Sequence, residues 1–115
     1  MRVLVCGGRD YGDVTMVGGV LDGINRADGI AVIIQGGASG ADMLARGWAM
    51  ANGVNTVTHA ADWQKHGRAA GPIRNQFMLE HEKPDLVVAF PGGRGTADMI
   101  RRARTSGVAV MNITQ

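Results

Sequence analysis

The chain has 115 residues, of which 45% are hydrophobic, and a formal net charge of only +2. This length is typical of one domain with one core, and the hydrophobic content excludes a disordered tail. Nucleic-acid binding needs clustered basic charge, and strand binding also needs aromatic stacking platforms, whereas aromatic residues make up 4% here. We therefore expect a single domain over residues 1–115 and no nucleic-acid partner.

Cys6 is the only cysteine, so an internal disulfide and a cysteine-rich zinc site are excluded. The three histidines, at positions 59, 66 and 81, lack metal-ligand spacing, and we expect no metal site. No apolar run approaches the ~18 residues of a membrane span, and the N-terminus lacks a signal-peptide pattern. These absences predict a cytoplasmic protein without membrane contact.

The first half of the chain predicts strands and helices in alternation. Short apolar runs at residues 2–6 and 30–35, each followed by Gly-Gly, are typical of buried strands. Apolar residues at helical spacing predict a helix over residues 14–27 between them. A second helix is expected over residues 39–53, and the more polar residues 54–59 predict a strand at the sheet edge.

The second half continues the alternation after residues 60–70, which show no period and are expected to form a loop. The expected elements are a helix from Gly71-Pro72 to Pro84, a strand at 85–90, a helix from Thr96 to Gly107 and a strand at 108–113. In the first of these helices, Ile73, Phe77 and Met78 are expected to face the core.

This alternation predicts an α/β fold, a Rossmann-like three-layer sandwich around a mainly parallel five-stranded sheet. Right-handed crossovers favour the strand order 3-2-1-4-5. Ligands of such sheets bind beyond the carboxyl ends of the strands, at the switch point between strands 1 and 4. Three glycine-rich loops, residues 7–12, 36–40 and 91–95, are expected to meet at this edge.

Glycine loops that lead into helices are typical of phosphate sites. A helix N-terminus offers free N–H groups and partial positive charge, and glycine removes the Cβ that would keep an anion away. The alternative is that the glycines only permit tight turns, but three such loops on one edge favour phosphate binding. Neither a Walker pattern nor G-x-G-x-x-G is present, so we infer no ATPase, no dinucleotide oxidoreductase and no cofactor.

Several polar residues have both a structural and a binding interpretation. Ser39 and Asp42 have the spacing of a capping box, and Thr96 is placed to cap the last helix; each is also placed to contact ligand. Arg9 and Arg94 lie in glycine loops, where they are either solvated or bound to ligand.

Arg74 and Asp98 are the candidate catalytic residues. Arg74 falls in the first turn of its predicted helix, where the dipole disfavours a cation and a ligand phosphate would compensate. Asp98 lies near the start of the last helix, where an acid is favoured by the dipole. The alternative for Asp98 is contact with a ribose hydroxyl or a role as acid and base.

Three motifs, "GGASGAD", "ADW…G…AGPxRN" and "FPGGRGTADM", resemble in order and spacing the YspA/YpsA-related branch of the SLOG superfamily. The resemblance runs from Gly7 to Met99, and the last motif is the most specific. The superfamily includes the DprA/Smf proteins and the lonely-guy (LOG) proteins. It implies a Rossmann-like fold that binds nucleotides or nucleotide-derived ligands.

LOG enzymes remove the base from nucleoside monophosphates, and other SLOG domains sense molecules derived from NAD or ADP-ribose. The LOG motif P-G-G-x-G-T-x-x-E matches Pro91 to Thr96, but its final Glu falls on Met99. Asp98 and Asp42 are the nearest acids in its place, and Arg74 takes the position of the LOG arginine.

The resemblance therefore implies a domain that binds a nucleotide or an ADP-ribose-like ligand. The alternative is a LOG-like phosphoribohydrolase, an N-glycosidase acting on nucleoside 5'-monophosphates. A DNA-processing role like that of DprA fits less well, because the chain is short and lacks a basic stripe. LOG proteins share pockets across a dimer, which implies a homo-oligomer here. The expected ligand-binding residues are Gly7, Gly8, Arg9, Gly36, Gly37, Ser39, Asp42, Arg74, Asn75, Pro91, Gly92, Gly93, Arg94, Gly95, Thr96 and Asp98.

Overall fold

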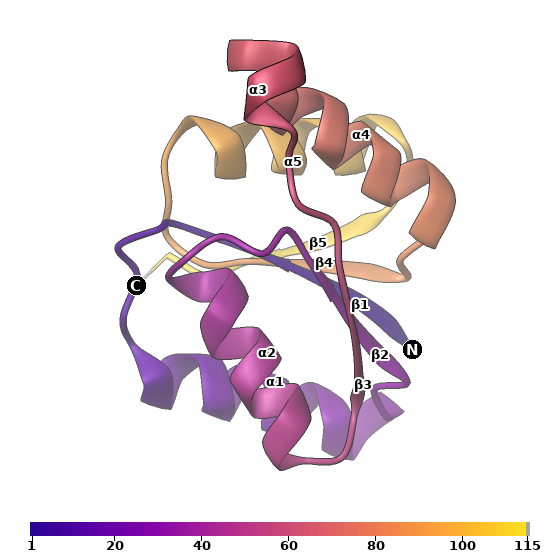
Figure 1. Cartoon of the computed structure of the whole chain (residues 1–115). Helices are drawn as coiled ribbons and strands as arrows, with labels where there is room; N and C mark the ends of the chain where they lie inside the picture. Colours follow the sequence, from indigo (N-terminus) through magenta and orange to yellow (C-terminus); the bar gives the residue numbers. More distant parts are fainter. Residues whose placement is uncertain (115) are drawn as a thin grey trace.

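The computed structural model describes residues 1–114 and shows a parallel sheet between two pairs of helices (Figure 1). The elements are β1 (Arg2–Cys6), α1 (Val14–Asp28), β2 (Val32–Gln35), α2 (Ala41–Ala51), β3 (Asn55–Thr58), α3 (Trp63–His66), the 3₁₀ turn η1 (Gly67–Ala69), α4 (Ala70–Glu82), β4 (Leu86–Ala89), α5 (Arg94–Thr105) and β5 (Ala109–Asn112). The strand order β3-β2-β1-β4-β5 confirms the predicted Rossmann-like topology.

The central strand β1 shows why the sheet needs two helical layers. It pairs with β2 on one side and β4 on the other, for example through Val3 beside Ile33 and Leu86. Successive side chains of a strand point to opposite faces, so Val3 packs with the α1–α2 layer and Leu4 with the α4–α5 layer. Burying each such side chain stabilises the fold by roughly 1.5–3 kcal/mol.

The edge at the carboxyl ends of the strands follows from the same topology. The chain leaves β1 toward α1 on one face and leaves β4 toward α5 on the opposite face, which makes a switch point between these two strands (Figure 1). β3 and β5 lie at the sheet edges and are only partly buried. The prediction of an edge strand at residues 54–59 is therefore confirmed.

The segment 60–70 is not a plain loop as predicted. It contains α3 and η1, which run directly into α4. Asp62 begins α3 by accepting a hydrogen bond from the Lys65 amide at 3.0 Å, the pattern of an N-cap. A helix of four residues is too short to show a hydrophobic period, which is why periodicity missed it.

Helix α4 begins at Ala70, and two predictions made for this helix, the place of Arg74 and the buried face, differ from the structure. Arg74 lies in the second turn, not the first, so the dipole argument made for it is wrong. Met78 is buried as predicted, but Ile73 and Phe77 are 46% and 43% exposed. Adjacent helix residues point about 100° apart, so Phe77 and Met78 do not share one buried direction. Phe77 instead stacks on His81 at a ring distance of 4.0 Å.

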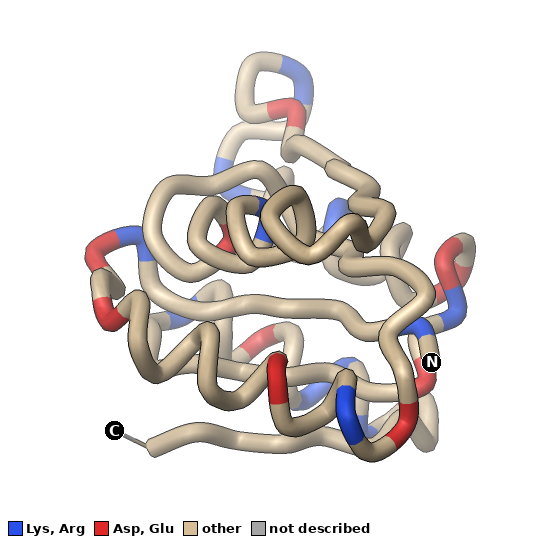
Figure 2. The backbone as a smooth tube through the Cα atoms, turned by 90° about the horizontal axis from the view of Figure 1, so that it is seen from below, with Lys and Arg blue, Asp and Glu red and all other residues tan. Residues whose placement is uncertain are grey.

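Charge is spread over the molecule, with basic and acidic residues interspersed along the backbone (Figure 2). Within residues 1–114, every helix is too short or too polar to cross a bilayer.

Candidate functional site

A cavity of about 1060 Å³ lies at the carboxyl edge of the sheet, where the three glycine loops meet α3 and α4. The predicted binding residues that line it are Gly7, Gly8, Arg9, Gly36, Gly37, Ser39, Asp42, Arg74, Asn75, Pro91, Gly92, Gly93, Arg94, Gly95 and Thr96. Asp98 is the predicted site residue that does not line it. The sequence therefore located the cavity, but the three loops play different parts in it.

The loop after β1 holds the other two loops together. A Cβ on Gly7 would lie 2.6 Å from the Ala41 Cβ, and the Gly8 amide donates to the Pro91 carbonyl at 2.9 Å. The Gly8 carbonyl in turn accepts from the amide of Ala41 at 3.2 Å. The tight-turn alternative therefore accounts for these two glycines, which serve close backbone packing.

The loop at residues 36–40 uses its amides internally. The carboxylate of Asp42 accepts from the Gly36 amide at 3.1 Å and from the Ala38 amide at 3.2 Å. The Gly37 amide donates to the Gln35 side chain at 2.6 Å. The amides of Gly36, Gly37 and Ala38 are thus engaged by side chains and are not available to an anion.

The predicted capping box of Ser39 and Asp42 is wrong because α2 begins two residues after Ser39. Gly40 occupies the N-cap with φ +76°, and a Cβ there would collide with the Gly8 carbonyl oxygen, so a glycine is required. Ser39 is exposed, and its hydroxyl donates to the Arg9 carbonyl at 3.2 Å. Asp42 reaches back to the loop instead of closing a cap.

Asp42 is a buried carboxylate on the cavity wall, with 6% of its surface exposed. Burial raises the pKa of Asp42, while the Ala38 and Gly36 amides and the nearby charge of Arg74 oppose that rise. One carboxylate oxygen, Oδ2, accepts the hydrogen bonds from both amides.

The loop at residues 91–95 has the opposite character. Helix α5 begins at Arg94 with Gly93 as N-cap and no side-chain cap, so the predicted cap by Thr96 is wrong. A Cβ on Gly93 or Gly95 would meet no atom within 4 Å. The first N–H groups of a helix have no acceptor within the helix, and the helix dipole is positive at this end. This helix start is therefore open to an anion on the cavity side.

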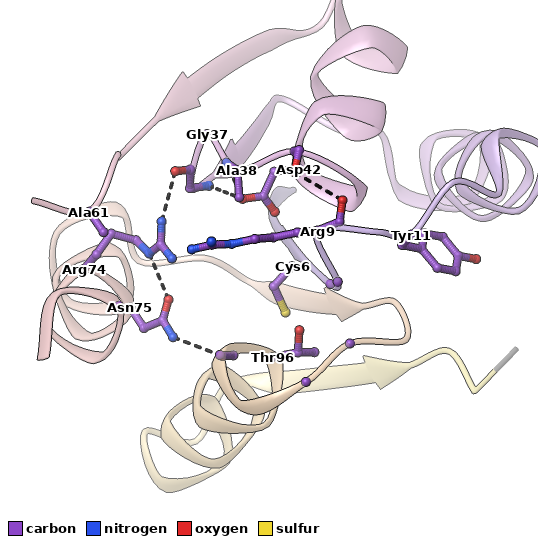
Figure 3. A pocket seen from close by; sticks show the side chains of 18 of the residues that line it. Cys6, Arg9, Tyr11, Gly37, Ala38, Asp42, Ala61, Arg74, Asn75 and Thr96 are labelled. Atoms are coloured by element: carbon purple, nitrogen blue, oxygen red, sulfur yellow. Dashed lines mark hydrogen bonds between the residues drawn. The ribbon is translucent and has the colours of Figure 1, made fainter. Parts of the chain in front are cut away.

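Arg74 points into the cavity from α4, as Figure 3 shows. Its Nη1 donates to the Gly36 carbonyl at 3.0 Å and to the His59 carbonyl at 3.4 Å, and its Nε donates to the Asn75 side chain at 3.1 Å. Among residues 1–114, no carboxylate lies within ion-pair distance of this guanidinium. The site thus holds a half-buried cation whose hydrogen bonds all go to neutral acceptors.

A second cation faces the first. Figure 3 shows the Arg9 side chain extended across the cavity toward Arg74. Burial lowers the pKa of Arg74, the charge of Asp42 opposes this, and the charge of Arg9 lowers it further. Two facing guanidinium groups with one carboxylate nearby favour binding of an anion.

Asp98 lies behind the cavity wall. It accepts hydrogen bonds from the Asn75 side chain at 3.0 Å, from Arg101 at 2.6 Å and from Arg102 at 2.9 Å. Burial raises the pKa of Asp98, but the bonds from Asn75 and Arg102 and the arginine charges outweigh it and hold the pKa below its usual value. Asp98 therefore holds Asn75, whose amide also donates to the Gly95 carbonyl at 3.2 Å.

Trp63 and Cys6 also line the cavity and were not among the predicted binding residues. Trp63, at the start of α3, has 48% of its surface exposed, and Arg9 Cζ lies 5.4 Å from the centroid of its ring. Cys6 lies at the end of β1, where burial raises the pKa of its thiol to about 12 and suppresses the thiolate. In the described part of the chain, no group of three His, Cys, Asp or Glu side chains is placed to hold a metal ion.

Comparison with known proteins gives a family and a fold. A family model of the YspA, cpYpsA-related SLOG family matches residues 1–66. The gene 61 protein of Mycobacterium phage D29 is 40% identical over 119 residues, covering 96% of this chain and 94% of that protein.

Among solved structures, a UDP-N-acetylglucosamine 2-epimerase superposes with a TM-score of 0.61 at 15% identity, and covers 98% of this chain. The UDP-GlcNAc 2-epimerase from Neisseria meningitidis, bound to UDP-GlcNAc, superposes with a TM-score of 0.58 at 17% identity and the same coverage. The chain spans about a third of these epimerases, 33% and 32% respectively, so the likeness concerns the Rossmann-like fold.

Proposed function

The chain belongs to the YspA, cpYpsA-related SLOG family, and from this premise we propose that it binds a nucleotide or an ADP-ribose-like, nucleotide-derived molecule. The ligand lies in the cavity at the carboxyl edge of the sheet, with a phosphate at the start of α5. The family and the Rossmann-like fold support this class of ligand. The site supports it through charge and through free backbone donors.

The observation that carries the proposal is that one cavity brings together two groups that can each donate to an anion. The start of α5 has no side-chain cap and leaves open space around Gly93 and Gly95. Arg74 presents a half-buried guanidinium without a carboxylate partner in residues 1–114. A phosphate accepts hydrogen bonds from both kinds of donor and supplies the missing negative charge.

The remaining polar groups fit a sugar next to that phosphate. Asp42 offers its second carboxylate oxygen, Oδ1, to a ribose hydroxyl, since the two loop amides bind Oδ2. Asn75 is held by Asp98 and lines the same cavity, so its position is fixed before a ligand enters. Fixed polar groups lower the entropic cost of binding.

Calorimetric titration with AMP, ADP-ribose and NAD tests the binding proposal. Gly93→Val places a side chain at the helix start, where an added Cβ meets no atom within 4 Å, and we expect affinity to fall at least about 10-fold. Gly12→Val is the matched control, because it adds the same side chain in open space outside the cavity. Unchanged affinity in a folded Gly93→Val protein would show that the phosphate does not bind at the start of α5.

A second function, hydrolysis of the N-glycosidic bond of a nucleoside 5'-monophosphate, is favoured by the position of Asp42. Such cleavage needs an acid or base near the sugar, and Asp42 is a buried carboxylate on the cavity wall. Burial raises its pKa, which helps a carboxyl hold a proton for a leaving base. Asp98, the residue expected for this role, is bound by two arginines outside the cavity.

Release of free base from a pool of nucleoside monophosphates, followed by chromatography with mass detection, tests this second function. An enzyme that uses Asp42 loses turnover in Asp42→Asn by at least about 100-fold, the size of an acid–base contribution. No base release from the wild-type protein, with ligand retained, leaves the binding function alone.

Assembly into a homo-oligomer remains part of the proposal. Helix α4 carries exposed Ile73 and Phe77, which offer apolar area for a second copy. Light scattering coupled to gel filtration measures the mass directly, and a monomer at all concentrations would contradict this part.

A further inference from the structure

Trp63 is a large aromatic residue that the fold does not bury. Its side chain lines the cavity and is 48% exposed, whereas the other tryptophan, Trp48, is 9% exposed in the core. The six-membered ring lies close to the start of α4, since a Cβ on Gly71 would be 3.4 Å from Trp63 Cη2. The indole is thus fixed at one edge while much of its surface stays available to the cavity.

Arg9 occupies part of that available surface. Its guanidinium carbon lies 5.4 Å from the centroid of the ring, an attractive cation–π position. In the described chain, no carboxylate lies within ion-pair distance of Arg9, and the side chain is exposed. The contact with Trp63 is therefore easily exchanged for another partner.

A nucleobase fits between these two groups after a small movement. A planar ring stacked on both sides needs about 7 Å between its neighbours, twice the ~3.5 Å contact distance. The gap of 5.4 Å has to open by about 2 Å for this, or Arg9 has to swing away. Ala60 and Ala61 line the same cavity with small side chains.

We propose that Trp63 and Arg9 form the base-binding subsite of the cavity. The base of the nucleotide stacks on the indole of Trp63, and Arg9 moves outward to cover its other face. This inference rests on the proposed function, because it assumes that the ligand is a nucleotide. Stacking accepts any base, so the subsite selects for the presence of a base more than for its identity.

Two probes separate the base from the phosphate. AMP carries a base, whereas ribose 5-phosphate has the same sugar and phosphate without it. Removal of a base-stacking aromatic residue weakens binding by about 5- to 150-fold. We therefore expect Trp63→Ala to lose AMP affinity by such a factor and to keep the affinity for ribose 5-phosphate, both measured by calorimetry.

Trp63→Phe is the matched variant, since it keeps a ring on the same backbone. We expect it to retain AMP binding within about 5-fold of the wild type. Its remaining tryptophan, Trp48, lies in the core, so fluorescence quenching by AMP should be present in the wild type and absent in this variant. This readout holds even if Trp63→Ala fails to fold.

Equal losses for AMP and ribose 5-phosphate in Trp63→Ala would overturn the inference, because Trp63 would then only support the cavity wall. Unchanged AMP affinity in Trp63→Ala, or quenching that persists in Trp63→Phe, would overturn it as well. A wild-type protein that binds neither probe, and neither ADP-ribose nor NAD, contradicts the proposed function itself, which is a different result from either of these.

Discussion

Two loops of this protein look alike in sequence and differ in what their backbones offer. Residues 36–40 ("GGASG") and residues 91–95 ("PGGRG") both follow a buried strand, both are rich in glycine and both lead into a helix. In the first loop, Asp42 accepts the amides of Gly36 and Ala38. Neither helix start has a side-chain cap, but the side-chain contact to the second loop is made to a carbonyl, that of Gly95, and leaves the amides alone.

The difference lies in how a carboxylate stabilises each loop. Asp42 accepts hydrogen bonds directly from the Gly36 and Ala38 amides of its loop, so these amides are not available to a ligand. Asp98 acts through Asn75, whose amide donates to the Gly95 carbonyl and leaves the N–H groups of α5 free. An acid near a glycine loop can thus close an anion site or support an open one, depending on which backbone atoms it reaches.

The largest effect is expected from Gly40→Ala in the loop at residues 36–40, whose amides Asp42 binds. The backbone at Gly40 has φ +76° and ψ −129°, a region almost reserved for glycine, and the new Cβ would collide with the Gly8 carbonyl oxygen. We expect the free energy of unfolding to fall by about 3 kcal/mol or more. Urea denaturation measures it, and a loss below about 1 kcal/mol would show that the loop relaxes easily.

Asp42→Ala tests whether the Asp42 carboxylate stabilises the loop at residues 36–40. The substitution leaves the amides of Gly36 and Ala38 without their acceptor, which we expect to cost about 2 kcal/mol of stability. Hydrogen exchange of these two amides should rise at the same time. If stability and exchange stay unchanged, water replaces the carboxylate and the loop is not closed by it.

Gly93→Val tests the loop at residues 91–95, and its main effect is expected on binding. We expect a loss of about 1.4 kcal/mol or more in the binding of AMP or ADP-ribose, which is a factor of 10, and a stability loss of at most about 1 kcal/mol, because valine is a poorer N-cap than glycine. Calorimetry and thermal denaturation of the same sample measure the two quantities. A stability loss as large as that of Gly40→Ala would mean that the two loops are alike after all.

Gly95→Ala and Gly47→Ala form a matched pair on two helices. Both positions are exposed and open, so alanine should stabilise each helix by up to about 1 kcal/mol. Only Gly95 lines the cavity, and only its variant should weaken nucleotide binding, by about 2- to 10-fold. Equal binding by both variants would argue that the first turn of α5 does not touch the ligand.

The smallest effect is expected from the pH dependence of Asp98. Its pKa is lowered by folding below the unfolded value of about 3.9, so its charge stabilises the fold above that pH. This contribution is lost as the pH falls through the lower folded pKa. The stability difference between wild type and Asp98→Asn should be about 1 kcal/mol near pH 7 and shrink below about pH 4. A stability difference that is independent of pH would show that the charge of Asp98 does not stabilise the fold.

The sequence predicted the fold because its signals are local and repeated. Strands such as residues 2–6 are short apolar runs, helices such as 14–27 carry an apolar stripe, and their alternation determines the parallel topology. The same topology brought the three glycine loops to one cavity.

The roles of individual residues depend on contacts that no local pattern encodes. Ser39 and Asp42 have capping-box spacing, but the requirement for a positive φ at Gly40 moves the helix start past Ser39. Asp98 is withdrawn from the cavity by Arg101 and Arg102 on its own helix and by Asn75 from α4. Helix spacing shows that the arginines can reach Asp98, but the contact with Asn75 depends on how α4 packs on α5.

The most direct test of the central claim is an amide NMR titration of the labelled protein with AMP. We expect large shifts of the Gly93, Arg94, Gly95 and Thr96 amides, since these donors face the phosphate, with small shifts at Gly36 and Ala38. Large shifts at Gly36 and Ala38 with none at the start of α5 would contradict it, because the phosphate would then bind the loop that Asp42 was thought to close.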